Sequence, residues 1–224
     1  MTRSLLTMNK NMFKKICHLT SVHPRNDGRI FYKECISLKN IGWNVSLIVW
    51  DGKDNSIVDG VNIVNVGKVF KSKALRLILS PFLLYYSAIR QKCDLYHFHD
   101  PELILTGLLL KCSGKKVVYD IHEDLKQQIL LKQWIPRPIR KLISKVFEII
   151  EVTSSKYFDA LVVPQPSMAK MYVNNVNRNT IQVANFVNIS RLTAPKVKLS
   201  TANYVTLFHG GALTKDRGLI NMLE

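Results

Sequence analysis

Histidines and carboxylates follow two apolar segments of the sequence, at the point where each segment ends. They are His97, His99, Asp100 and Glu102 after the first segment, and His122, Glu123 and Asp124 after the second. Both segments read as buried strands, and an open parallel sheet binds its ligands at the carboxyl ends of its strands. Imidazole and carboxylate groups in that position can transfer protons, hydrogen-bond hydroxyl groups or hold a metal ion.

The overall composition restricts the classes of protein. The chain has 224 residues, 47% of them hydrophobic, which is enough for one buried core and the start of a second. Its formal net charge of +16 predicts attraction to polyanions such as nucleic acid, anionic lipid or phosphorylated substrates. We predict no nucleic-acid partner, because the sequence has no aromatic-basic platform, helix-turn-helix pattern or zinc-finger spacing.

The cysteines and the N-terminus indicate a cytoplasmic protein. Cys17, Cys35, Cys93 and Cys112 lack CxxC spacing and lie in apolar segments, as is typical of reduced core thiols. The first ten residues contain too short an apolar stretch for a signal peptide, and no small-residue cleavage site follows.

Two amphipathic segments bear on membrane contact. Residues 74–89 include Arg76 and Pro81 and are shorter than the ~20 residues of a bilayer span, so we expect a helix packed on the sheet. A second helix is expected from Trp134 to about Thr153, with a stripe formed by Ile139, Leu142, Ile143, Val146 and Ile150. Because basic residues accompany both helices, peripheral binding to the anionic inner face of the cytoplasmic membrane is an alternative to a solvated surface.

Strand and helix patterns alternate along most of the chain. Besides the two strands that precede the His-and-acid motifs, strands are expected at residues 13–20, 43–50, 61–66, 157–164 and 180–184. Helices are expected at residues 29–41 and 103–111 as well. This alternation predicts an α/β fold with a Rossmann-like parallel sheet and helices on both faces.

The pattern divides the chain into four regions. They are an N-terminal tail at 1–12, a Rossmann-like domain at 13–184, a polar linker at 185–202 and the incomplete start of a second domain at 203–224. In the last region, Gly210 and Gly211 precede Lys215 and Arg217 at the start of a helix. Backbone N–H groups and basic side chains in that arrangement can bind a phosphate, although a tight turn with solvated charges is the alternative.

Four motifs resemble those of retaining glycosyltransferases with the two-domain GT-B fold, of the group 1 or family 4-like type. The motifs lie at residues 27–34, 96–103, 119–124 and 210–218. The closest resemblance is to bacterial enzymes that build capsule, lipopolysaccharide or exopolysaccharide, and it runs from about Lys14 to the end. It implies transfer of a sugar, with retention, from a UDP- or GDP-sugar to a lipid-linked or saccharide acceptor by an enzyme of hexosyltransferase type. It also implies no required cofactor and no metal ligand.

The resemblance gives roles to particular residues. His122 matches the family histidine that faces the transferring sugar and is the expected catalytic residue. Residues expected on the acceptor side of the cleft are Asp27, Gly28, His99, Asp100, Glu102 and Glu123. Residues expected to bind the donor diphosphate are Gly210, Gly211, Lys215 and Arg217. For Asp100 and Glu102, a helix N-cap and an interaction with the helix dipole are the alternatives.

The chain is shorter than the family it resembles, which normally continues for another ~150 residues of donor-binding domain. We therefore expect this polypeptide alone to be inactive, either as a truncated gene product or as half of an enzyme completed by a second chain. Two other classes stay open. One is a non-catalytic module that docks a lipid-linked acceptor on the membrane. The other is a metal-dependent hydrolase, since His97 and His99 share one face of a strand and the HED motif adds carboxylates.

Overall fold

The fold is built on one eight-stranded sheet. The computed structural model describes residues 15–69, 72–122, 124–132 and 135–186. The strands are β1 (Lys15–Leu19), β2 (Asn44–Val49), β3 (Ser56–Val58), β4 (Val61–Asn65), β5 (Leu95–Phe98), β6 (Lys116–Asp120), β7 (Ala160–Val163) and β8 (Thr180–Gln182). Their order is β3-β4-β2-β1-β5-β6-β7-β8, and every pair is parallel except β3 with β4. The predicted parallel α/β sheet is confirmed.

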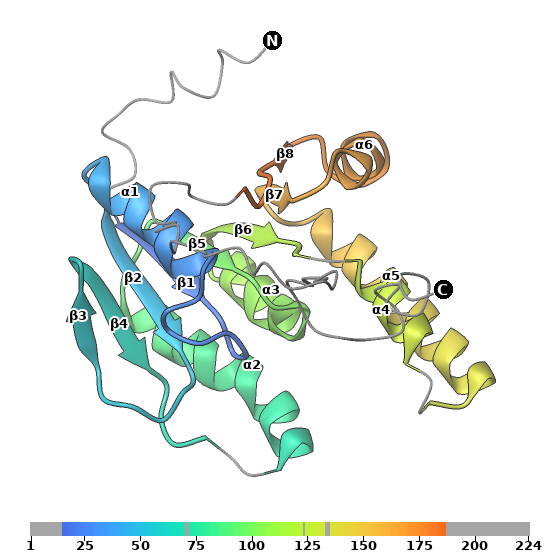
Figure 1. The fold of residues 1–224 in the computed structure, drawn as a ribbon, viewed down its shortest axis with the longest axis horizontal. Helices are drawn as coiled ribbons and strands as arrows, with labels where there is room; N and C mark the ends of the chain where they lie inside the picture. Colours follow the sequence, from blue (N-terminus) through green and yellow to red (C-terminus); the bar gives the residue numbers. More distant parts are fainter. Residues whose placement is uncertain (1–14, 70–71, 123, 133–134, 187–224) are drawn as a thin grey trace, which may run out of the picture. The chain divides into compact units, whose positions relative to one another are not determined.

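Helices cover both faces of this sheet (Figure 1). They are the π-helix η1 (Ile30–Cys35), α1 (Ile36–Asn40), α2 (Lys73–Arg90), the 3-10 helix η2 (Pro101–Leu103), α3 (Ile104–Cys112), α4 (Leu125–Leu131), α5 (Arg137–Ser155) and α6 (Pro166–Asn175). Among these helices, none is both long and apolar enough to cross a bilayer.

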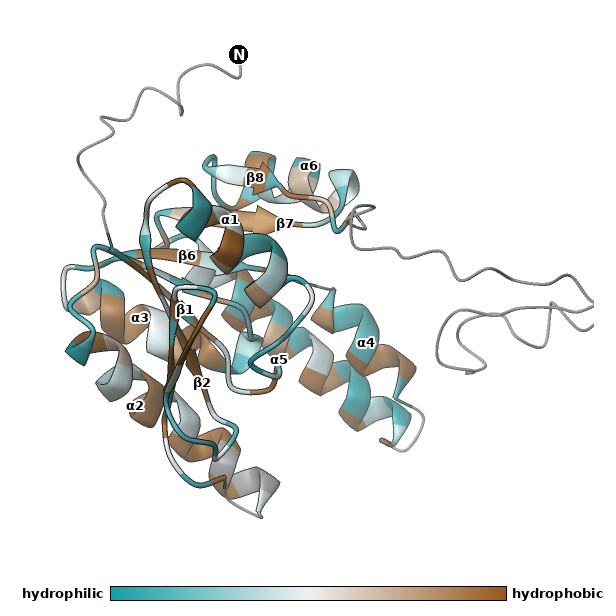
Figure 2. Ribbon diagram, turned by 60° about the vertical axis from the view of Figure 1, so that its left-hand side comes forward, coloured by the Kyte–Doolittle hydropathy of each residue, from teal (hydrophilic) through white to brown (hydrophobic). Residues whose placement is uncertain are grey.

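The side chains of each central strand alternate between two apolar cores, because successive residues of a strand point to opposite faces. In β1, Cys17 and Leu19 pack toward α2 and α3, whereas Ile16 packs with Phe31 of η1 on the other face. The neighbouring strands β1 and β2 are strongly hydrophobic (Figure 2). His18 is two residues after Ile16 in β1, so its side chain also lies on the η1 face of the sheet.

The α2–α3 face is closely packed. Gly107 of α3 lies against the Phe98 ring, and a Cβ atom at that position would be 2.5 Å from Phe98 Cε1. The Thr106 hydroxyl donates to the carbonyl of Pro81 at 2.9 Å. That bond joins α3 to the middle of α2, where proline has no N–H of its own to continue the helical ladder.

Several elements differ from the sequence prediction. The antiparallel strand β3 and the helices α4 and α6 were not expected, and the helix expected at 29–41 begins as a π-helix. Three cysteines are buried free thiols as predicted, but Cys112 is exposed at the end of α3. The tail, the linker beyond Phe186 and the second-domain segment lie outside the described residues, so the four-region division stays a prediction.

The face that α5 buries is polar, which reverses the usual amphipathic arrangement. Its buried residues are Ser144, Glu151, Ser154 and Ser155. Small serines let α5 approach its neighbours, and the Glu151 carboxylate accepts hydrogen bonds from Tyr119 at 2.9 Å and Tyr172 at 3.1 Å. Four of the five residues of the apolar stripe expected on this helix are consequently turned outward, with Leu142 66% exposed, whereas Ile143 is half-buried.

Candidate functional site

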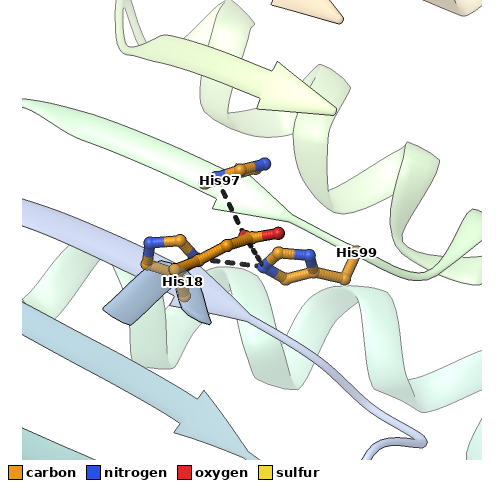
Figure 3. A group of neighbouring side chains, drawn as sticks. His18, His97 and His99 are labelled. Atoms are coloured by element: carbon orange, nitrogen blue, oxygen red, sulfur yellow. Dashed lines mark hydrogen bonds and ion pairs between the residues drawn. The ribbon is translucent and has the colours of Figure 1, made fainter. Parts of the chain in front are cut away.

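Three histidines from β1 and β5 face one another on the η1 side of the sheet. The strand register places His18 opposite His97, and the His99 backbone continues the pairing by donating to Leu19 O at 3.1 Å. The ring centroids are 4.6 to 5.3 Å apart, and the three rings turn toward one another (Figure 3). His18, His97 and His99 are 0%, 8% and 1% exposed.

A carboxyl group from η1 completes this cluster. Glu34 Oε2 lies 3.8 Å from His18 Nδ1, 3.9 Å from His97 Nδ1 and 3.8 Å from His99 Nε2. His18 Nδ1 and His99 Nε2 are 3.0 Å apart, within hydrogen-bond distance. We call His18, Glu34, His97 and His99 the histidine pocket.

A buried ion pair lies next to the histidine pocket. Arg29 donates from Nε and from a terminal nitrogen to the two carboxylate oxygens of Asp120, both at 2.9 Å. Asp120 is fully buried, and Arg29 Nε is also 3.2 Å from Glu34 Oε1. A bidentate guanidinium–carboxylate pair is among the strongest charge-assisted hydrogen bonds in proteins.

Asp120 also connects the histidine pocket to His122. Its Oδ2 atom lies 3.3 Å from His99 Nδ1 and 3.1 Å from His122 Nε2, and the two ring nitrogens are 3.2 Å apart. Asp120 therefore orients both imidazoles, the buried one and the one that reaches the surface.

Burial and hydrogen bonding together determine the protonation states in this region. Burial alone would raise the pKa of Asp120, but hydrogen bonds from His122, His99 and Arg29 outweigh it and hold that pKa below its usual range. Burial and the nearby Asp120 carboxylate raise the pKa of Glu34 to about 9. Burial, together with the neighbouring His99 ring, lowers the pKa of His97 to about 3. At neutral pH, the Arg29–Asp120 pair is thus charged, whereas Glu34 and His97 are neutral.

The other two histidines of the histidine pocket behave in the same way. Burial, with His97 and His99 adjacent, holds the pKa of His18 well below its ordinary value. Burial also lowers the pKa of His99, although its hydrogen bond with Asp120 acts in the opposite direction. Neutral imidazoles are hydrogen-bond acceptors and metal ligands.

Asp100 and Glu102 hold the loop that follows β1. Asp100 Oδ2 accepts bonds from the Thr20 hydroxyl at 2.8 Å and the Ser21 backbone N–H at 2.6 Å. Glu102 Oε1 accepts from the Ser21 hydroxyl at 2.5 Å. Asp100 occupies the N-cap position of η2, but its side chain makes no capping bond there. Both carboxylates therefore act on the first βα loop.

A pocket of about 320 Å³ opens above this network at the carboxyl edge of the sheet. It is lined by His23, Asp27, Gly28, Arg29, Lys33, His122, Pro164 and Asn185. Asp27 Oδ1 accepts from the backbone N–H groups of Arg29 and Ile30 at 2.8 and 2.9 Å, which fixes the start of η1. Its side chains include one carboxylate, two cations and two imidazoles, which can hydrogen-bond a ligand rich in hydroxyl groups.

The structure separates the predicted site residues into two layers. Asp27, Gly28 and His122 line the open pocket. His99 and Asp100 are buried beneath it and can act on a ligand only through their neighbours. Glu123, Gly210, Gly211, Lys215 and Arg217 lie outside the described residues.

Sequence reasoning missed His18, Arg29, Glu34 and Asp120, as well as His23 and Lys33 of the pocket lining. Arg29 and Glu34 both lie in the motif at residues 27–34, and Asp120 lies in the motif at 119–124. The motifs therefore indicated where these residues lie in the sequence. They did not indicate that Arg29 pairs with Asp120, which is 91 positions away.

Comparison with known proteins gives a family match and several distant structural matches. The model described as Glycosyltransferase Family 4 matches residues 28–191. No curated protein sequence matches the chain at a significant level.

The structural matches are to longer proteins of low sequence identity. Sucrose-phosphate synthase from Thermosynechococcus elongatus is similar with a TM-score of 0.59 at 13% identity, over 79% of this chain and 49% of that one. Os79 from O. sativa, determined in complex with UDP, has a TM-score of 0.53 at 8% identity, over 78% and 53%. UGT2 from Phytolacca americana has a TM-score of 0.52 at 8% identity, over 76% and 51%. The chain spans about half the length of these structures, and at such identities the likeness shows the fold alone.

Proposed function

The chain belongs to glycosyltransferase family 4, and we propose that its described residues form the acceptor-binding domain of a GT-B enzyme. In this proposal, a sugar passes from a UDP- or GDP-sugar to a lipid-linked or saccharide acceptor with retention. The expected pathway is synthesis of a bacterial surface polysaccharide. Family membership favours sugar transfer over the metal-dependent hydrolase that the sequence left open.

The observation that carries this proposal is the position of His122. It lines the polar pocket at the carboxyl edge of the sheet, beside Asp27 and Gly28. Ligands of open α/β sheets bind at this edge. The UDP seen with a structural relative supports a nucleotide-sugar donor for this chain as well.

The contacts of His122 suggest how it acts. Its Nε2 atom lies 3.1 Å from the Asp120 carboxylate, which favours a proton on Nε2. That tautomer leaves Nδ1 as an acceptor, and no group among the described residues bonds to it. Nδ1 can therefore accept a hydrogen bond from a sugar hydroxyl, while Asp120 stabilises positive charge that develops on the ring.

The donor contacts belong to the same proposal. We assign the diphosphate to Gly210, Gly211, Lys215 and Arg217, with Glu123 on the acceptor side. The cationic groups would neutralise phosphoryl charge, and the glycines would let backbone N–H groups approach it.

A transfer assay tests the proposal. The protein is incubated with UDP- and GDP-sugars and with polyprenyl-linked or free saccharide acceptors, with and without a second chain that supplies a donor domain. Release of UDP or GDP that depends on the acceptor is the expected result in the sample that contains the second chain. His122→Ala should lower that rate at least 100-fold, as expected for loss of a group that acts on the reacting sugar. Lys53→Ala, an exposed change in the turn after β2, should leave it unchanged. A His122→Ala protein with the wild-type rate would contradict the assigned role.

A second candidate function is membrane docking through α5. Its exposed apolar residues are Ile139, Leu142, Val146, Ile149 and Ile150. Exposed basic residues Arg137, Lys141 and Lys145 lie on the same helix, and apolar and polar positions alternate along it (Figure 2). An apolar stripe beside basic side chains suits the interface of an anionic bilayer, and the net charge of +16 adds to that attraction.

Sedimentation with vesicles tests this candidate. Wild-type protein should pellet with phosphatidylglycerol vesicles and remain in solution with phosphatidylcholine vesicles. Leu142→Glu should reduce pelleting, because it places a carboxylate in the acyl boundary, whereas Ile57→Glu at exposed β3 should not. Equal pelleting of both variants would show that α5 is not the docking face.

A further inference from the structure

We propose that the histidine pocket binds a zinc ion through His18, Glu34, His97 and His99. The role inferred is structural: the ion would join β1, β5 and η1 beneath the acceptor pocket. It would take no part in sugar transfer, for which no metal was expected. This inference goes beyond the function proposed above.

The ligand atoms already have nearly the spacing that zinc requires. All four lie within 4.8 Å of one another, and the distances that join them include 3.0, 3.8 and 3.9 Å. In tetrahedral zinc sites the ligands lie ~2.0–2.1 Å from the metal, which puts them roughly 3.3 Å from each other. Most of these distances exceed the tetrahedral spacing, so the four side chains would have to move closer together around the ion. Three imidazoles and one carboxylate form a ligand set that suits zinc.

Polar atoms in the histidine pocket lack the partners that burial normally demands. Among the described residues, both carboxylate oxygens of Glu34 and the Nε2 atoms of His18 and His97 have no hydrogen-bond partner. A buried polar group without a partner costs about 1–3 kcal/mol. A cation between Glu34 and the three rings would meet the carboxylate, His18 Nδ1, His97 Nδ1 and His99 Nε2. It would therefore give the Glu34 carboxylate a partner, but it would not reach Nε2 of His18 or His97.

Asp120, which contacts the far side of the His99 ring, is also the kind of partner that a metal-binding histidine has. If His99 binds the ion through Nε2, its Nδ1 atom faces Asp120 Oδ2 at 3.3 Å. Carboxylate–histidine–metal arrangements of this kind orient the ring and raise its basicity. The same Asp120 carboxylate contacts His122, so the ion would also stabilise the orientation of the proposed catalytic residue.

A neighbouring cluster of His99, Asp120 and His122 is a poorer site for the ion. Its ligand atoms are close together too. However, both Asp120 oxygens accept hydrogen bonds from the Arg29 guanidinium, which already supplies the positive charge there. In the histidine pocket, Arg29 Nε lies 3.2 Å from Glu34 Oε1 as an ion pair without a hydrogen bond, and it makes no bidentate contact there.

Metal content and cobalt spectroscopy test the proposal. The full chain is purified without a histidine tag, loaded with zinc, dialysed and analysed for metal, and a second sample is loaded with Co²⁺. We expect about one zinc per chain. Visible absorption of tetrahedral Co²⁺ should also develop to saturation at one equivalent. Thermal unfolding should shift upward with zinc and return on chelation, because a ligand bound only to the folded state stabilises it.

Variants locate the site. Glu34→Gln and His97→Ala should each lower zinc affinity at least 100-fold, since even outer-shell changes cost 10–100-fold. His23→Ala, a histidine outside the four ligands, should bind zinc like the wild type. Absence of zinc and of the cobalt spectrum in the wild-type protein would overturn the proposal. So would binding that survives Glu34→Gln and is lost in His23→Ala. The wild-type spectrum decides the question even where a variant fails to fold.

Discussion

Removing one partner of the Arg29–Asp120 pair should cost more stability than removing one partner of any other ion pair that the structure describes. Arg29→Met removes both 2.9 Å bonds and leaves a fully buried carboxylate with only histidine donors. Removing one partner of a buried pair costs about 3–5 kcal/mol. We expect Arg29→Met near the middle of that range, at about 4 kcal/mol.

The reverse change should cost less. In Asp120→Asn, Arg29 keeps the carbonyl of Val183 at 3.1 Å and has the Glu34 carboxyl 3.2 Å away. Glu34 can ionise and replace the lost counter-charge, so we expect about 3 kcal/mol. Because the double variant leaves no isolated charge, its cost should be lower than the sum of the two by about 2 kcal/mol.

Urea unfolding followed by tryptophan fluorescence, with a chelator present, measures these free energies. Arg25→Met is the matched control. Arg25 also makes a bidentate pair, with Asp51 at 2.6 and 2.8 Å, but both side chains are partly exposed. We expect about 1 kcal/mol for it. Equal losses for Arg29→Met and Arg25→Met would refute the argument from burial.

Three further predictions concern packing and charge away from the site. Burial alone would raise the pKa of Asp159, but two lysines and a backbone N–H lower it. The Asp159 carboxylate therefore stabilises the fold at pH values above its pKa in the unfolded chain. That stabilisation is lost as the pH falls through its lower pKa in the folded state. The stability difference between wild type and Asp159→Asn, from urea unfolding at several pH values, should therefore shrink below about pH 4. Gly107→Ala should lower the melting temperature although alanine favours helices, because its Cβ would meet Phe98; an unchanged melting temperature would contradict this contact. Tyr119→Phe removes one of the hydrogen-bond donors of the buried Glu151 carboxylate, so the free energy of unfolding measured in urea should fall by about 1–3 kcal/mol. Glu151→Gln should lower the free energy of unfolding by less than Tyr119→Phe does.

The sheet could be predicted from the sequence because its central strands are continuous apolar runs. β3 escaped prediction because it has three residues, two of them exposed. In α6, only Tyr172 is buried, so its apolar periodicity is weak. For α5 the periodicity gave a helix, but its inward face depends on Tyr119 and Tyr172, the tyrosines that meet Glu151.

The site was predictable only in part. Period-two alternation placed His97 and His99 on one face, and the position of His122 after a strand placed it at the carboxyl edge. Glu34 could not be identified, because its direction depends on the π-helix, which shifts side chains relative to an ordinary α-helix. Arg29 was hidden because its partner is distant in the sequence.

The strand order also has a consequence for how the molecule folds. β1 is first in the sequence but central in the sheet, between β2 and β5. During synthesis it can pair at once with β2, whereas its other edge stays open until residues 95–98 have been made. Parallel pairing over such a separation is slow, and an unpaired edge invites aggregation. We expect pulsed hydrogen exchange during refolding to show the amides of the β1–β2 and β5–β6 pairings protected before the amides that join β1 to β5. Protection of all four strands in one step would contradict this order. The histidine pocket spans the β1–β5 seam, so it should form only when the two halves of the sheet join.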